Sequence, residues 1–257
     1  MKILMIGDAV GRAGREAIVA LLPSLRRELA VDFVVANGEN ASAGRGLTSS
    51  IAGELLQAGV DVITTGNHVW DQKEIIPFLD GDLPVLRPLN YPPGVPGHGI
   101  LHKDGVTVIN LQGRVFMRSI DCPFQAMDRV LTDIPESSII LVDIHADATS
   151  EKLAIGWFLD GRVSAVVGTH THVGTVDTRV LPKGTAYVTD LGMTGARDSV
   201  IGDKIEAVLH LFLTAMPTRL EPANGPAILN SVLIDVDEKT GRARSIQRVD
   251  REIDNGK

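Results

Sequence analysis

The chain contains several short runs that are almost continuously apolar, and this pattern is compatible with few folds. The predicted strands are Ile3–Ile6, Phe33–Ala36, Val60–Thr64, Val106–Leu111, Ile139–Ile144, Val163–Val167 and Ala186–Thr189. Their residues do not alternate between apolar and polar, which is typical of strands that are covered on both faces. Stretches with helical periodicity separate them. This order predicts an α/β protein with a largely parallel sheet.

The segments between the runs supply the expected helices. The spacing of apolar residues and of capping residues predicts helices over Arg15–Leu29, Thr48–Ala58, Thr149–Leu159 and Asp203–Ala215. Near the end of the sequence, Ile228–Val236 and Arg244–Val249 flank a glycine-containing turn and predict a hairpin. No repeat or linker divides the chain, so we expect a single domain over residues 1–257.

The composition excludes several classes of protein. With 257 residues, 44% of them hydrophobic, the chain can bury a sizeable core, which argues against disorder. A net charge of −7 and an aromatic content of 4% argue against a stable complex with nucleic acid. The longest apolar candidate, Val208–Met216, is about half of the ~18 residues that cross a bilayer. The single cysteine, Cys122, permits no internal disulfide. We therefore expect a soluble cytoplasmic protein.

Unusual polar side chains follow directly after five of the apolar runs. They are Asp8, then Glu39 with Asn40, then Asn67 with His68, then His145, and finally His170 with His172. In open α/β sheets, functional groups gather beyond the carboxyl ends of the strands. The sequence therefore predicts that these side chains lie close together.

The chemistry of this set favours metal ions. It contains two carboxylates, two amides and four imidazoles, with no thiolate. Unpaired carboxylates at one point would repel each other and raise each other's pKa, whereas a bound dication removes that cost and favours neutral imidazole. The set exceeds what one four-coordinate zinc ion needs and suits two metal ions that share a carboxylate.

The same residues carry a resemblance to a known family. Gly7-Asp8, Gly38-Glu39-Asn40, Gly66-Asn67-His68, His145 and Gly168-Thr-His170-Thr-His172 resemble, in this order, the motifs of calcineurin-like metallophosphoesterases. The strings ANGENA, TTGNHVWD, RPLNYPPG, HADATSEK, GTHTHVGT and DLGMTGARDSVIG resemble the YmdB-like branch, bacterial proteins associated with 2′,3′-cyclic nucleotide phosphodiesterase activity. The resemblance implies an α/β sandwich of two packed β-sheets flanked by helices. It also implies that the whole chain forms one metallophosphoesterase domain.

The resemblance also implies roles for individual residues. One metal ion would be held by Asp8, Glu39, Asn40 and His172, and the other by Glu39, Asn67, His145 and His170. His68 resembles the family's catalytic histidine, which is not a ligand and protonates the leaving oxygen. Two departures from the wider superfamily stand out: Val10 replaces the histidine of the first motif, and Glu39 replaces the usual bridging aspartate. The donor set admits iron, manganese, zinc or cobalt, and the resemblance favours iron or manganese.

We therefore expect a binuclear metal-dependent phosphodiesterase that hydrolyses small phosphate esters, above all 2′,3′-cyclic nucleotides such as 2′,3′-cyclic AMP. Attack would come from a metal-bridged hydroxide, with His68 as proton donor. Two alternatives stay open: a metal-dependent ester or amide hydrolase, and a regulatory or sensor protein that binds a metal–nucleotide complex with little turnover. Arg45 and Arg197 lie in loops that either contact substrate or are simply solvated, and the sequence assigns no role to His98 or His102. It also leaves open whether the protein forms a homo-oligomer.

Overall fold

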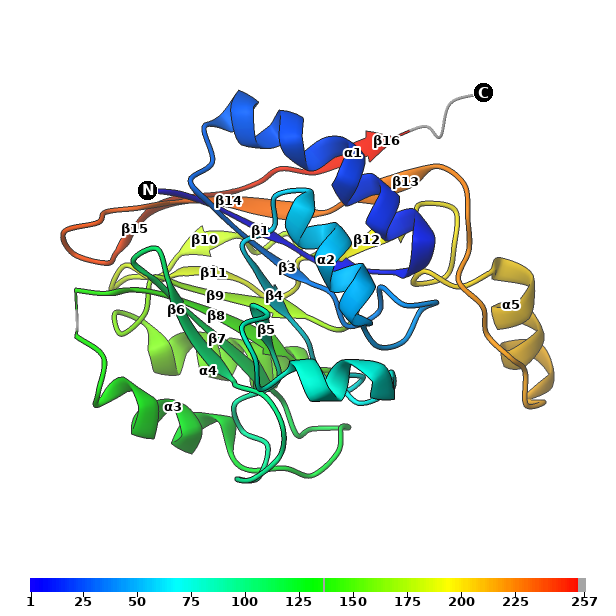
Figure 1. The fold of residues 1–257 in the computed structure, drawn as a ribbon, viewed down its shortest axis with the longest axis horizontal. Helices are drawn as coiled ribbons and strands as arrows, with labels where there is room; N and C mark the ends of the chain where they lie inside the picture. Colours follow the sequence, from blue (N-terminus) through cyan, green and yellow to red (C-terminus); the bar gives the residue numbers. More distant parts are fainter. Residues whose placement is uncertain (136, 254–257) are drawn as a thin grey trace.

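Two six-stranded sheets packed face to face form the centre of the molecule in the computed structural model, which describes residues 1–135 and 137–253 (Figure 1). The first sheet has the order β15 (Ala243–Arg248), β14 (Ser231–Val236), β1 (Lys2–Ile6), β3 (Phe33–Asn37), β4 (Val62–Thr64) and β5 (Val85–Leu86). The second has the order β10 (Arg179–Val180), β11 (Ala186–Val188), β9 (Ala165–Thr169), β8 (Ile139–His145), β7 (Val106–Gln112) and β6 (Ile100–Lys103). In both sheets the central strands are parallel, as the sequence predicts.

The packing of the sheets explains why the strand sequences are continuously apolar. In β1, Ile3 and Met5 face the second sheet and belong to the apolar layer that the two sheets share. Leu4 and Ile6 face the opposite way and pack with the helices outside the first sheet. Since successive side chains of a strand point to opposite faces, a strand that is covered on both sides needs apolar residues at every position.

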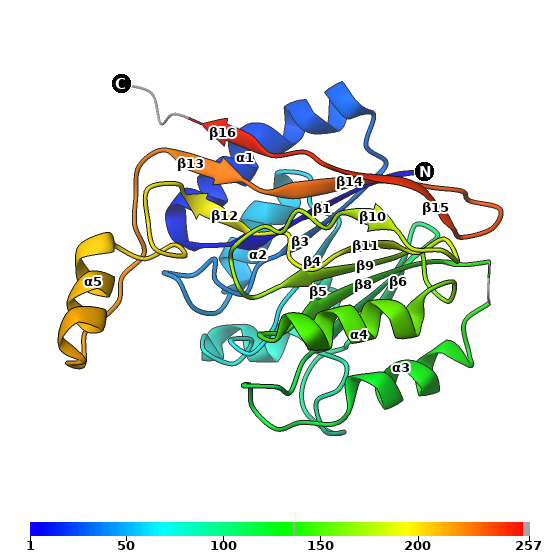
Figure 2. The same ribbon diagram turned by 180° about the vertical axis from the view of Figure 1, so that it is seen from behind.

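Helices cover the outer face of each sheet (Figures 1 and 2). The first sheet is covered by α1 (Gly11–Leu29) and α2 (Ser49–Gln57), and the second by α3 (Pro123–Leu131) and α4 (Thr149–Leu159). The short 3₁₀ helix η1 (Lys73–Phe78) lies beside α2, and α5 (Ile205–Thr214) projects from the body of the molecule. The predicted α/β sandwich of two sheets flanked by helices is therefore confirmed. Among the described residues, no helix is long and apolar enough to cross a membrane.

A small third sheet contains β16 (Arg251–Ile253), β13 (Ala227–Leu229), β12 (Met193–Ala196) and β2 (Asp8–Ala9). It corrects one prediction, because Ile228–Val236 is not one continuous strand. The chain passes between sheets at Asn230, whose carbonyl accepts a hydrogen bond from Gly7 N (3.0 Å) and whose side-chain amide donates to Met193 O (2.8 Å). The hairpin itself is confirmed, since β14 pairs antiparallel with β15.

The remaining differences concern short elements. α1 begins at Gly11 rather than at Arg15. The structure also contains α3, a helix that the sequence pattern does not predict. α3 spans only nine residues, and its buried positions are Pro123, Ala126 and Met127, too few to produce a clear helical period. Strands of two residues, such as β5 and β10, fall below what periodicity can detect.

Candidate metal centre

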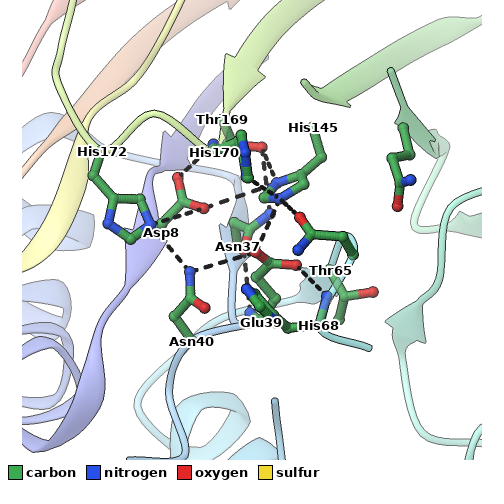
Figure 3. A network of polar contacts seen from close by, with 12 residues as sticks. Asp8, Asn37, Glu39, Asn40, Thr65, His68, His145, Thr169, His170 and His172 are labelled. Carbon is green, nitrogen blue, oxygen red and sulfur yellow. Dashed lines mark hydrogen bonds and ion pairs between the residues drawn. The ribbon is translucent and has the colours of Figure 1, made fainter. Parts of the chain in front are cut away.

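The polar residues that follow the strands lie together where the carboxyl ends of the two sheets meet (Figure 3). The first sheet contributes the segments after β1, β3 and β4. The second contributes the end of β8 and the loop after β9. Asp8 reaches the site through β2, which pairs with β12 in the small sheet. The residues brought together are Asp8, Glu39, Asn40, Asn67, His68, His145, His170 and His172.

One group of donor atoms surrounds the Nε2 atom of His145. Glu39 Oε1 lies 2.9 Å from it, Asn67 Oδ1 3.0 Å, and His170 Nδ1 3.0 Å. Ligand atoms of Glu39, His145 and His170 all lie within 4.8 Å of one another. A single ring N–H cannot serve three neighbours, whereas a cation with several ligands can. This arrangement fits a metal ion.

A second group of donor atoms surrounds Nε2 of His172. Asn40 Nδ2 lies 3.0 Å from it and Asp8 Oδ1 3.8 Å. Asp8 Oδ1 is buried and has no hydrogen-bond partner among the described residues. Because a buried carboxylate oxygen without a partner is costly, its position beside an imidazole nitrogen also fits a cation. Glu39 lies between the two groups, since its Oε1 also accepts a hydrogen bond from Asn40 (3.4 Å).

Hydrogen bonds fix which nitrogen of each imidazole faces the centre. Thr169 Oγ1 donates to Asp143 (2.7 Å) and therefore accepts from His145 Nδ1 (2.9 Å), which leaves Nε2 of His145 free to bind a metal. His172 Nδ1 donates to the backbone carbonyl of Ile201 (2.7 Å), which has the same effect on its Nε2. Such outer contacts are the usual support of histidine ligands.

Electrostatics at the centre favour positive charge. Burial lowers the pKa of His145, but the neighbouring carboxylate of Glu39 outweighs it and raises this pKa to about 9. Burial would raise the pKa of Glu39, yet His145 lowers it to about 2. For His170, burial and the charge of His145 lower the pKa to about 3, so its imidazole is neutral. The carboxylates therefore stabilise a cation at a point where a neutral imidazole is available as a ligand.

Residues outside the predicted set support the centre. Asp143 is buried within β8, accepts hydrogen bonds from Thr64, Thr169 and Asn37, and has its pKa raised by burial. Its one detectable signal is a carboxylate inside the apolar run Ile139–Ile144. Gly66 is also required, because a Cβ atom there would lie 2.1 Å from the ring of His145.

The loop that carries His170 and His172 has an unusual backbone. These two residues have φ angles of +97° and +66°, in a region that residues other than glycine rarely adopt. Asp190 holds the loop: its carboxylate accepts hydrogen bonds from Thr171 N (3.2 Å) and Thr171 Oγ1 (2.7 Å). The buried Lys152 pairs with the same carboxylate at 2.6 Å. Strained backbone of this kind persists only where surrounding contacts fix it.

A cavity of about 410 Å³ opens beside the centre and is bordered by Glu39, His68, His172 and Arg45. Arg45 is thus placed to meet a ligand. Arg197 is not, since its guanidinium pairs with Glu252 (2.8 Å) away from this cavity. His102 lies in β6, where it contacts Thr107 (3.1 Å), and it does not border the centre.

The comparisons with known proteins agree with this geometry. Residues 4–249 match the YmdB-like protein family. The 2′,3′-cyclic-nucleotide 2′-phosphodiesterase of Bacillus subtilis (strain 168) is 47% identical over 254 residues, which are 97% of this chain and 96% of that protein. A novel phosphatase from Mycoplasma pneumoniae has a TM-score of 0.93 at 33% identity, covering 99% of this chain and 94% of that one. A hypothetical protein from Thermus thermophilus has a TM-score of 0.92 at 44% identity, covering 98% of this chain and 99% of that one.

The two-sheet fold, the cluster of side chains that can hold a metal ion and these relatives define an enzyme of the phosphodiesterase and phosphatase class. Within that class, the chain belongs to the YmdB-like protein family. The family resemblance inferred from the sequence motifs is therefore confirmed. The prediction of a phosphoric diester hydrolase is confirmed as well.

Asp8→Asn is expected to stabilise the metal-free protein at pH 8 by up to about 3 kcal/mol. Burial raises the pKa of Asp8 from 3.8 to about 6, so the ionised carboxylate is disfavoured in the folded state. In the wild type this cost disappears as the pH falls through about 6 towards 4, so the two proteins should converge there. Urea unfolding with a chelator at pH 8 and pH 4 measures the difference. Equal stabilities at pH 8 would contradict the assigned cost.

Proposed function

We propose that this enzyme hydrolyses small phosphate diesters, with 2′,3′-cyclic nucleotides as the principal substrates, and that it uses two metal ions. The observation that carries the proposal is the pair of donor groups around His145 Nε2 and His172 Nε2, joined by the buried Glu39. The activity of the Bacillus subtilis relative supports the choice of substrate.

The donors divide between the two ions as their positions suggest. One ion would be held by Asp8, Glu39, Asn40 and His172, and the other by Glu39, Asn67, His145 and His170. Bound dications would supply the Lewis acidity that activates the attacking water and offsets charge on the phosphoryl oxygens. Carboxylate, amide and imidazole donors without a thiolate admit iron, manganese, zinc or cobalt, and we propose iron or manganese because the family resemblance favours them.

His68 is proposed as the proton donor to the leaving oxygen. Its Nδ1 atom lies 2.9 Å from Asp71 Oδ2, an arrangement that orients the ring and leaves Nε2 free to face the substrate. Its backbone N donates to Glu39 Oε2 (3.2 Å), which keeps the residue next to the centre. In a 2′,3′-cyclic diester the leaving group is a ribose alkoxide. Because an alkoxide is a poor leaving group, protonation by His68 would matter most for this substrate.

Arg45 is proposed to orient the phosphate. It borders the 410 Å³ cavity and brings the positive charge that suits a phosphate oxygen. A guanidinium on this wall fits a small anionic ester better than a neutral carboxylic ester or amide.

The test combines metal analysis with two hydrolysis assays and a binding measurement on protein purified without a chelator. We expect close to two transition-metal ions per chain, hydrolysis of 2′,3′-cyclic AMP, and little release of nitrophenol from p-nitrophenyl acetate. Removal of the metal should abolish the diester activity, and manganese should restore it. Faster hydrolysis of the acetate would favour the carboxylic ester hydrolase. Tight binding of 2′,3′-cyclic AMP without turnover would favour the sensor protein.

A further inference from the structure

A second cavity, of about 370 Å³, adjoins the metal centre on the side of β7. Its walls are Asn67, His68, Asp71, Phe116, Met117, Arg118 and His170. His68 and His170 also border the 410 Å³ cavity, so the two cavities meet at the centre. A ligand whose phosphorus atom lies at the centre therefore has room for a substituent in this second cavity.

Phe116 is the unusual side chain of this cavity. It is 87% exposed, although a phenylalanine ring gains free energy when it leaves water. It also has a φ of +62°, a strained value for a bulky residue. The chain is poor in aromatic residues, at 4%, and this exposed one lines the same cavity as His68. The structure thus keeps an open aromatic face available at the wall of the cavity.

The loop that carries Phe116 is fixed at its base. The backbone N atoms of Arg114 and Val115 donate to the carboxylate of Glu151, at 3.0 and 3.1 Å. Met117 packs against the apolar core under the second sheet, so its neighbour Phe116 is directed outward. Gly113 permits the approach, because a Cβ atom there would lie 2.5 Å from Glu151 Oε2. The ring is therefore presented by an anchored loop.

We propose that Phe116 and Arg118 form a nucleobase subsite, in which the base of the substrate stacks on the Phe116 ring. This inference rests on the proposed function. It adds a site that recognises the part of the substrate outside the phosphate. Every base has a π-face, so stacking tolerates any base. The guanidinium of Arg118 can add a planar cationic contact to the same base. The subsite therefore selects nucleosides as a class, with little preference among bases.

The test compares two five-membered cyclic diesters that differ in the base. They are 2′,3′-cyclic AMP and glycerol 1,2-cyclic phosphate, assayed with the manganese-loaded enzyme. We expect the wild type to prefer the nucleotide in kcat/KM. Phe116→Ala should lower that preference about tenfold or more, mainly through KM, and Phe116→Trp should keep it within about threefold of the wild type. Phe212→Ala, at an exposed phenylalanine on α5 outside both cavities, is the matched control and should leave the preference intact.

The outcomes separate this subsite from the proposed function. If the wild type hydrolyses both diesters equally well, the phosphodiesterase stands and the subsite is overturned. Equal losses on both substrates in Phe116→Ala would also overturn it, because the loop would then serve only the structure of the site. Hydrolysis of neither diester would overturn the proposed function, and the subsite with it.

Discussion

His68→Ala is expected to lower kcat for 2′,3′-cyclic AMP by roughly 10²–10⁴-fold while the metal content stays at the wild-type level. The variant removes the proposed proton donor but none of the donor atoms around His145 or His172. The effect should shrink for bis-p-nitrophenyl phosphate, since nitrophenolate leaves without protonation. Steady-state kinetics together with metal analysis of the same preparation provide the measurement.

Two sets of control variants test whether the loss of kcat is specific to His68. His210→Ala replaces an exposed histidine on α5 and should change neither the metal content nor kcat. Asp8→Ala and His172→Ala should instead lose metal, because each removes a donor atom of the second group. A metal-free His68→Ala protein would show that His68 is a ligand, and the proposed role would then be wrong.

Lys152→Met is expected to destabilise the protein by about 3–5 kcal/mol. Both Lys152 and Asp190 are buried, and their ion pair of 2.6 Å has no access to solvent. The variant leaves the Asp190 carboxylate buried without its counter-charge. Because that carboxylate also holds Thr171, the loop with His170 and His172 should loosen and bind metal more weakly. Urea unfolding of the metal-free protein gives the first effect, and metal titration gives the second.

A surface ion pair provides the matched control for this prediction. Lys204 pairs with Glu221 at 2.7 Å, but both side chains are about half exposed. Lys204→Met should therefore cost less than about 1 kcal/mol. The double variant Lys152→Met with Asp190→Asn should recover part of the lost stability, since the unpaired charge is gone. A loss below about 1 kcal/mol in Lys152→Met alone would contradict the importance of the buried pair.

The sequence is informative about the centre because its residues follow strands directly. Asp8, Glu39 and His145 each stand within two or three residues of a strand that the apolar pattern already predicts. In a parallel sheet, this local position is enough to infer a common edge. Composition adds the chemistry, since clustered carboxylates need a counter-ion. Local patterns could not predict that the strands divide into two sheets, which was expected only from the family resemblance.

The supporting residues were missed because their partners are far away along the chain. Asp143 accepts a hydrogen bond from Asn37, which is 106 residues away in sequence. From the sequence, Lys152 is expected to be an ordinary exposed helix residue. In the fold it lies against Asp190 instead. The left-handed backbone at His170 has no sequence signal either, since the usual residue at such a position is glycine. These features depend on tertiary contacts alone.

The donor atoms of the centre come from both sheets, and this has a consequence for how the protein can change. Residues before β5 supply one part of the proposed ligand set, and residues from β8 and from the loop after β9 supply the rest. Neither half of the chain therefore holds the complete proposed set. Mutations that slide one layer across the other would disturb the chemistry without touching a ligand. The chemistry therefore also depends on the apolar interior between the layers, at positions such as Met5 and Leu141.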